Sequence, residues 1–197
     1  MAQAEQIGLI SSETAITQAV GFLIQRQRPD GSWEEDKSVA SVAPIWAKPG
    51  DLSARLYLTA NCGFWLAVFG TTNRNVLQAA TFLQAYLNEN GHLPASWQAN
   101  WLASGLWWRL NWRDPARQLL SYLTQQISTL PASNLAWLAI TLLNARVPAS
   151  HTLLDTAASL LEQSQNRAGY WSSEEGAAWD VHATLEALRA LRLCGRF

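Results

Sequence analysis

The chain has 197 residues, of which 49% are apolar and 15% are charged, with a formal net charge of −1 and a sequence pI of about 6.3. This length predicts a single domain over residues 1–197 that buries about 70% of the surface of the unfolded chain. The near-neutral charge argues against a nucleic-acid-binding or anionic-membrane surface, because both require a basic patch.

Neither a targeting segment nor a membrane-spanning segment is predicted. The first residues lack a basic stretch followed by an apolar run, so we expect no signal peptide. Even the most apolar region, residues 97–112, contains Arg109 and several polar residues, which argues against a transmembrane segment. Two cysteines, Cys62 and Cys194, form no convincing disulfide framework. We therefore expect a cytoplasmic protein.

Apolar residues recur at helical spacing along the chain, and strand patterns are nearly absent. Turn and capping residues divide this pattern into eight segments. The predicted helices cover residues 12–28, 52–69, 75–88, 96–112, 115–128, 133–146, 150–165 and 177–194. Short loops join most of them in pairs, so we predict an all-α fold of four helical hairpins.

Two short motifs repeat along these hairpins. Trp-Leu-Ala begins at Trp65, Trp101 and Trp137, with a spacing of 36 residues each time. Leu-Pro-Ala-Ser ends at Ser96 and at Ser133, and each serine precedes an apolar helical pattern, as a helix N-cap does. A unit of 36 residues accommodates two helices of about a dozen residues and two short loops. Repeated hairpins of this kind bury their apolar faces against their neighbours.

A third repeat, Gln-x-x-x-Gly-x-Trp, occurs at residues 27–33 and again at residues 165–171. The glutamine amide can bond to backbone groups that are free where a helix ends, and the tryptophan ring can cover that junction. Glycine permits a positive φ in the turn between them. We predict a stabilising role for both copies.

This repeat resembles the QW motif of the squalene and oxidosqualene cyclases, which are relatives of the protein prenyltransferases. The resemblance covers most of the chain, although the second hairpin has Leu87 and Leu93 in the places of Gln and Trp. It implies an α/α toroid, with the second helix of each hairpin on the inside. Four hairpins form either a tight ring or an open arc, and an open arc favours a homodimer or a partner chain that covers its ends.

Tryptophans of the second helices are the candidate ligand-binding residues. Trp65, Trp101 and Trp137 occupy one position of the repeat. Trp97, Trp101 and Trp108 follow one stripe of a single helix. Facing the centre, these indoles would line a cavity for an apolar, isoprenoid-like molecule and could stabilise a carbocation through cation–π attraction. The alternative is that they fill gaps between helices, as aromatic stripes in protein cores do.

Asp180, His182 and Glu186 in the last predicted helix are the candidate catalytic residues. His182 and Glu186 share a helix face and could form a His–carboxylate pair for proton transfer. Asp180 diverges from His182 unless it lies in an unwound first turn. In the alternative interpretation Asp180 caps the helix, while Glu186 faces solvent or pairs with Arg189.

The family motifs for terpene chemistry are missing. The chain contains neither the Asp-x-Asp-Asp that the cyclases use as an acid nor the Asp-Asp-x-x-Asp that binds magnesium diphosphate. Both absences argue against ordinary terpene cyclisation.

A zinc site is suggested by residues 180–184, which resemble the Asp-x-Tyr-His-Thr of the prenyltransferase β-subunit. The resemblance fails at Cys62, because Ala60 stands where that family has a ligand Asp. His92 and His151 have no ligand spacing, so we predict no metal and no cofactor. The acidic residues 34–36 and 174–175, which follow the two QW motifs, are interpreted as solvated loop charge.

Three function classes remain open, because fold alone does not determine function. The favoured one is a cyclase-like enzyme, or a relative of one, that acts on an apolar ligand by acid–base chemistry. The others are a non-catalytic module that binds a hydrophobic ligand or a peptide, and an oligomeric scaffold. No Ser-His-Asp order, phosphate-binding glycine loop or basic stripe supports acyl transfer, nucleotide hydrolysis or nucleic-acid binding.

Overall fold

The computed structural model describes residues 1–70 and 74–197, and this part of the chain is helical, with no strand. The helices are α1 (Ala2–Gln6), α2 (Thr14–Arg26), α3 (Leu52–Val68), α4 (Arg74–Gln84), α5 (Trp97–Arg109), α6 (Arg113–Gln126), α7 (Ala132–Asn144), α8 (Thr152–Ser164) and α9 (Asp180–Leu193). The predicted all-α fold is confirmed, and each predicted helix differs from the observed one by only a few residues. The short helix α1 was not predicted.

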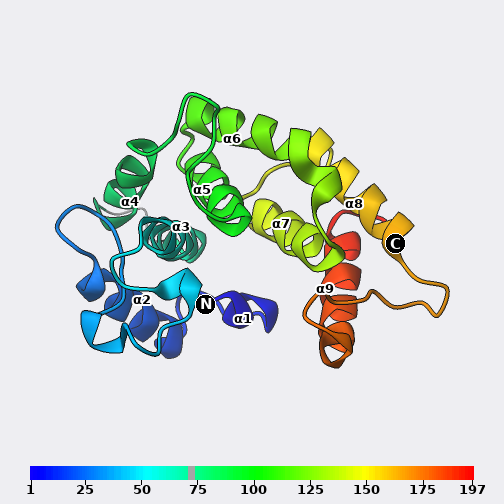
Figure 1. Cartoon of the computed structure of the whole chain (residues 1–197), viewed down its shortest axis with the longest axis horizontal. Coiled ribbons are helices and arrows are strands. Elements are labelled where there is room, and N and C mark those ends of the chain that lie inside the picture. Colours follow the sequence, from blue (N-terminus) through cyan, green and yellow to red (C-terminus); the bar gives the residue numbers. More distant parts are fainter. Residues whose placement is uncertain (71–73) are drawn as a thin grey trace.

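The second helices of the hairpins form a curved inner row, in the order α3, α5, α7 and α9 (Figure 1). On the outside of this row, α4 packs on α3, α6 on α5 and α8 on α7. The row is an open arc, and α1 lies across its opening, between α3 and α9 (Figure 1). Among the described residues, no helix combines the length and the apolar character needed to cross a bilayer.

Burial follows from these two layers. The inner helix α5 has neighbours on several sides, and its residues 99–107 are buried without a break. The outer helix α6 has one covered side, and the apolar residues it buries are Ala116, Leu119, Leu120 and Leu123, at the spacing of a single helical stripe. An amphipathic pattern therefore marks the outer helices, and nearly continuous burial marks the central inner helices α5 and α7, whereas α9 at the end of the row buries only one stripe.

Arg109, the last residue of α5, joins the C-terminal ends of three inner helices. Its guanidinium donates to the carbonyl oxygens of Ala67 at 3.0 Å and Val68 at 3.4 Å in α3, and to that of Asn144 at 2.8 Å in α7. Carbonyls in the last turn of a helix have no intrahelical partner and carry partial negative charge, so a cation stabilises them. Burial, with Arg146 nearby, lowers the pKa of Arg109.

The two QW motifs make the same hydrogen bonds. Each tryptophan donates its indole N–H, at 2.8 Å, to a leucine carbonyl in the preceding helix. Each glutamine donates its amide N–H to the carbonyl of the motif glycine, at 2.8 Å in the first motif and 2.9 Å in the second. The exposed fractions of Trp33 and Trp171 are only 4% and 1%. These contacts bear out the predicted stabilising role.

One of the two predicted serine caps is wrong. Ser96 caps α5 as expected and accepts the N–H of Ala99 at 3.3 Å. Ser133 instead lies inside α7, which begins one residue earlier, and its hydroxyl donates to Glu174 at 2.5 Å. The charged acceptor that the loop before α9 supplies makes a stronger bond with a hydroxyl than a neutral acceptor does.

Gly31 and Gly169 permit a test of the repeat, because they hold equivalent turns with the same φ of +88°. A Cβ at Gly31 would lie 2.6 Å from the carbonyl oxygen of Gln78, whereas a Cβ at Gly169 would meet nothing within 4 Å. We predict that Gly169→Ala lowers the free energy of unfolding by about 1–2 kcal/mol, the strain of a left-handed residue. Gly31→Ala should cost roughly 1–3 kcal/mol more, because of the clash. Urea unfolding measures both losses, and equal losses would contradict the packing described for Gly31.

Candidate functional site

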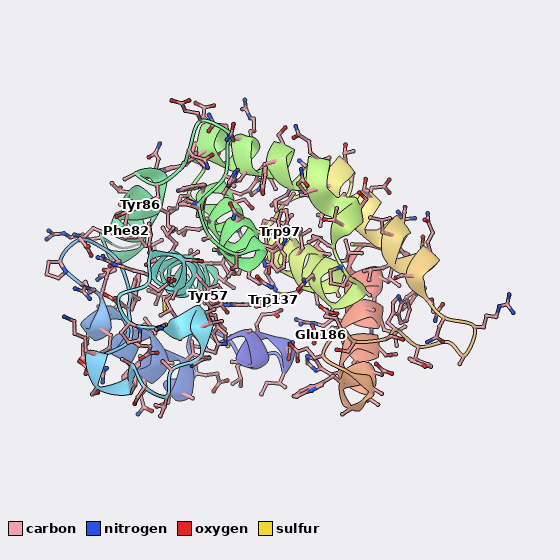
Figure 2. All side chains as sticks on the ribbon, in the orientation of Figure 1. Tyr57, Phe82, Tyr86, Trp97, Trp137 and Glu186 are labelled. Atoms are coloured by element: carbon pink, nitrogen blue, oxygen red, sulfur yellow. The ribbon has the colours of Figure 1, made fainter. Side chains whose placement is uncertain are left out.

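A cavity of about 600 Å³ lies at the centre of the arc, between α1 and the inner helices. We call it the central cavity. Figure 2 shows Tyr57 of α3, Trp137 of α7 and Glu186 of α9 around this space. From α5, α7 and α9 it is lined by the first two turns, so it lies at the end of the inner row opposite to Arg109.

One stripe of α3 faces the central cavity. Tyr57, Asn61 and Trp65 line it at intervals of four residues, which places them on one side of the helix. Burial raises the pKa of Tyr57, and the nearby Cys62 thiol acts in the same direction. The phenol therefore remains neutral at physiological pH and can donate a hydrogen bond.

The adjoining inner helices add amides and an indole. Gln98 of α5 and Asn134 of α7 lie 36 residues apart, at one position of the repeat, and the Gln98 amide donates to Asn134 Oδ1 at 3.4 Å. Trp137, one turn further along α7, is half-buried and also lines the cavity. This side of the cavity can therefore bind polar and apolar groups together.

Helix α9 and the loop before it supply charge. His182 and Glu186 line the cavity from α9, and Glu174 and Glu175 line it from the loop. The rings of His182 and Trp179 meet edge to face, with centroids 6.3 Å apart. The two glutamates that the sequence assigned to solvated loop charge are exposed, but they border the central cavity.

Glu186 also connects α9 to α1. Its Oε1 accepts a hydrogen bond from Gln6 at 2.9 Å, and its Oε2 lies 3.9 Å from Arg189 Nη1. Arg189 in turn forms an ion pair with Glu5. His182 and Glu186 thus share the cavity, but between these two described residues the structure has no hydrogen bond. The predicted His–carboxylate pair is present as neighbours only.

Asp180 does not line the central cavity, although it was predicted with His182 and Glu186. It is the first residue of α9, and its Oδ1 accepts the backbone N–H of Ser173 at 2.7 Å. This bond ties the helix to the loop that carries Glu174 and Glu175. Asp180 is thus a positioning residue in this structure, and it bonds to the loop rather than capping α9.

Of the five predicted tryptophans, Trp65 and Trp137 line the central cavity. The expectation of one indole stripe that faces the centre needs correction for the other three. Trp97 stacks on Tyr122 of α6, Trp101 is completely buried edge to face with Trp137, and Trp108 lies against the Arg113 guanidinium. The reason is that α5 is covered along its whole length, so each turn meets a different neighbour.

The Cys62 thiol, whose position resembled that of a zinc ligand, does not favour metal binding. Burial raises the pKa of Cys62 to about 12, with Glu35 acting in the same direction. The thiol therefore stays protonated, whereas a metal ligand is a thiolate. In the described parts of the chain, no group of three or more His, Cys, Asp and Glu side chains could hold a metal ion.

Comparison with known proteins identifies no relative: no protein-family model matches the chain, and no curated protein or solved structure matches it significantly.

Several residues of the cavity were missed from the sequence. The tyrosine and asparagine on α3 could have been found, because they lie eight and four residues before Trp65. The 36-residue spacing of Gln98 and Asn134 was a second signal. Glu174 and Glu175 gave no such signal, since their position depends on how their loop folds back over α7.

The role of Asp180 can be tested by two substitutions. Asp180→Asn keeps an oxygen that accepts the Ser173 N–H, so we predict a change of less than about 0.5 kcal/mol in the free energy of unfolding. Asp180→Ala removes the acceptor and should cost roughly 1 kcal/mol. Urea unfolding gives both values, and hydrogen exchange of residues 172–176 should accelerate only in the alanine variant. A large effect of Asp180→Asn on ligand binding would show instead that the charge itself is needed.

Proposed function

We propose that the chain binds a compact amphiphilic small molecule in the central cavity, as a cyclase-like enzyme or as a descendant of one. The observation that carries this proposal is a cavity of about 600 Å³ in which aromatic rings and hydrogen-bonding side chains converge from α3, α5, α7 and α9. Ligand sites in proteins commonly have volumes of about 300–1,000 Å³ and this mixed character.

The aromatic side favours an apolar body on the ligand. Tyr57, Trp65 and Trp137 lie on two inner helices and present ring surface to the cavity. Each methylene group moved from water onto such a surface contributes about 0.8 kcal/mol, so an isoprenoid chain of ten carbons gains several kcal/mol. This supports the isoprenoid-like ligand that the QW resemblance implies.

The polar side excludes a pure hydrocarbon. Amide groups of Asn61, Gln98 and Asn134 line the same cavity, and a ligand without polar groups would displace their water. Each buried amide left without a partner costs roughly 1–3 kcal/mol, which cancels much of the gain from the apolar contacts. The favoured ligand therefore carries a hydrogen-bonding group at one end.

His182 and Glu186 are the candidates for acid–base chemistry on such a ligand, because both line the cavity. Glu186 accepts a hydrogen bond from Gln6 and lies near Arg189, and these are contacts that a carboxylate makes. It suits the role of a base better than that of the strong acid needed to protonate an alkene. We therefore place proton abstraction ahead of alkene protonation.

A scaffold role is the second candidate, and a specific surface favours it. Val181, Leu185 and Leu188 follow one face of α9, with exposed fractions of 73%, 60% and 39%. An exposed apolar stripe on the last helix of an arc is where a second copy or a partner chain would pack. Sedimentation that shows a stable dimer, lost in Leu185→Glu, would support this role.

The cytoplasmic location remains a prediction.

Trp137 and Trp97 provide a matched test of the ligand site, because both are half-buried and only Trp137 lines the cavity. With geraniol as the probe, we predict that Trp137→Ala weakens binding at least about tenfold, whereas Trp97→Ala changes it less than about threefold. Equilibrium dialysis measures the affinities, and thermal unfolding shows whether each variant is folded. Equal losses in two folded variants, or no binding of geraniol to the unmodified chain, would count against the proposal.

A further inference from the structure

Resting on the ligand site proposed above, we infer that the molecule bound in the central cavity carries a positively charged nitrogen. Three carboxylates, those of Glu174, Glu175 and Glu186, line the cavity, and among the described residues no Lys or Arg side chain does. The other titratable side chains in its lining are Tyr57 and His182. The balance of charge around the ligand is negative.

Two of these carboxylates are not neutralised by the protein. Glu174 accepts a hydrogen bond from the Ser133 hydroxyl, which is uncharged. Glu175 forms no ion pair with any residue that the structure describes. Glu186 is the exception, since Arg189 lies 3.9 Å from it. The uncompensated charge is thus concentrated on the loop before α9.

Other positive groups lie near this end of the molecule. Met1 lines the cavity, and the charge of its amino group acts to lower the pKa of the Cys62 thiol. The N-terminal ends of α5, α7 and α9 carry partial positive charge, each equivalent to about half an elementary charge, and α9 has the carboxylate of Asp180 in its first turn. At α5 that end is capped by Ser96, and at α7 it lies beside Glu174. Glu175 remains free to meet a cation on the ligand.

The aromatic residues favour the same class of ligand. Trp137 and Trp179 line the cavity together with these carboxylates, and Tyr57 and Trp65 line it from α3. The face of an indole or phenol ring attracts an ammonium group, and the attraction increases where water is excluded. A phosphorylated or carboxylated ligand would instead face three like charges, and among the described residues no Lys or Arg side chain lines the cavity to bind it. The ligand is therefore an amine or a quaternary ammonium with an apolar body.

A charge series on one hydrocarbon chain tests this inference. Geranylamine, geraniol and geranate share ten carbons and are cationic, neutral and anionic at pH 7. We expect geranylamine to bind at least about tenfold more tightly than geraniol, and geranate to bind more weakly than both. Raising the ionic strength should weaken the binding of geranylamine and leave that of geraniol unchanged, because salt screens only the charged pair.

Substitutions then locate the charge. In Glu174→Gln/Glu175→Gln the preference for geranylamine over geraniol should fall below about threefold, while the affinity for geraniol stays within about twofold. Glu89→Gln is the control, since Glu89 is an exposed loop carboxylate outside the central cavity. It should leave the preference intact. Calorimetry or equilibrium dialysis measures each affinity.

The outcomes separate this inference from the function on which it rests. If geraniol binds in a manner that depends on Trp137 and geranylamine binds no more tightly, the positive charge is refuted and the ligand site stands. If geranate binds best, the inference is likewise refuted. If none of the three probes binds, the proposed function fails. A cation preference that survives in the double variant would show that the two loop glutamates are not its cause.

Discussion

Inner helices that run side by side in one direction bring their C-terminal carbonyl groups to the same end of the molecule, where partial negative charges accumulate. Arg109 resolves this conflict, because one guanidinium reaches carbonyls of α3 and α7 from the end of α5. At the opposite end, the described residues show a weaker connection, the hydrogen bond at 3.4 Å between Gln98 of α5 and Asn134 of α7. There the first turns of α5, α7 and α9 surround the central cavity. Arg109 thus holds the inner helices together at one end of the row, and the central cavity lies toward the other end. The space for the proposed ligand is at that second end.

The arc leaves one side open, and α1 closes it by polar contacts to α9 together with apolar contacts of Met1, Ala2 and Ala4 with the core. Glu5 pairs with Arg189, and Gln6 donates to Glu186. Ion pairs at a protein surface contribute about 0–1 kcal/mol each, so these polar contacts are weak compared with the packing of the inner row. Because Glu186 takes part in both the closure and the cavity, a ligand that contacts this carboxylate competes with Gln6 for it. A ligand of the proposed kind that binds Glu186 would therefore be coupled to the position of α1.

Periodicity was sufficient to predict the helices, because burial against neighbours in a repeat requires those patterns. It did not predict their closest packing, since α4, α6 and α8 each pack mainly on the inner helix that precedes them rather than on the one that follows. It did not predict α1, since five residues are too few to show a helical period. It also could not assign the tryptophans. Spacing along a helix defines the side on which Trp97, Trp101 and Trp108 lie, but not which neighbour each turn meets. Trp65, Trp101 and Trp137 are equivalent in the repeat, yet Trp101 alone of the three is absent from the cavity lining, because its indole is completely buried edge to face against Trp137.

The two QW motifs make the same internal contacts but lead into acidic loops with different surroundings. Each is followed by acidic residues, which suggested the same role from the sequence. After the first motif, Glu34 pairs with Arg28 and accepts the backbone N–H of Gly50 at 2.5 Å, so its charge is used within the fold. After the second motif, Glu174 and Glu175 border the central cavity, and neither forms an ion pair with a residue in the described part of the chain. A carboxylate that borders a cavity and has no cationic partner is stabilised more by a positively charged ligand than by the protein itself.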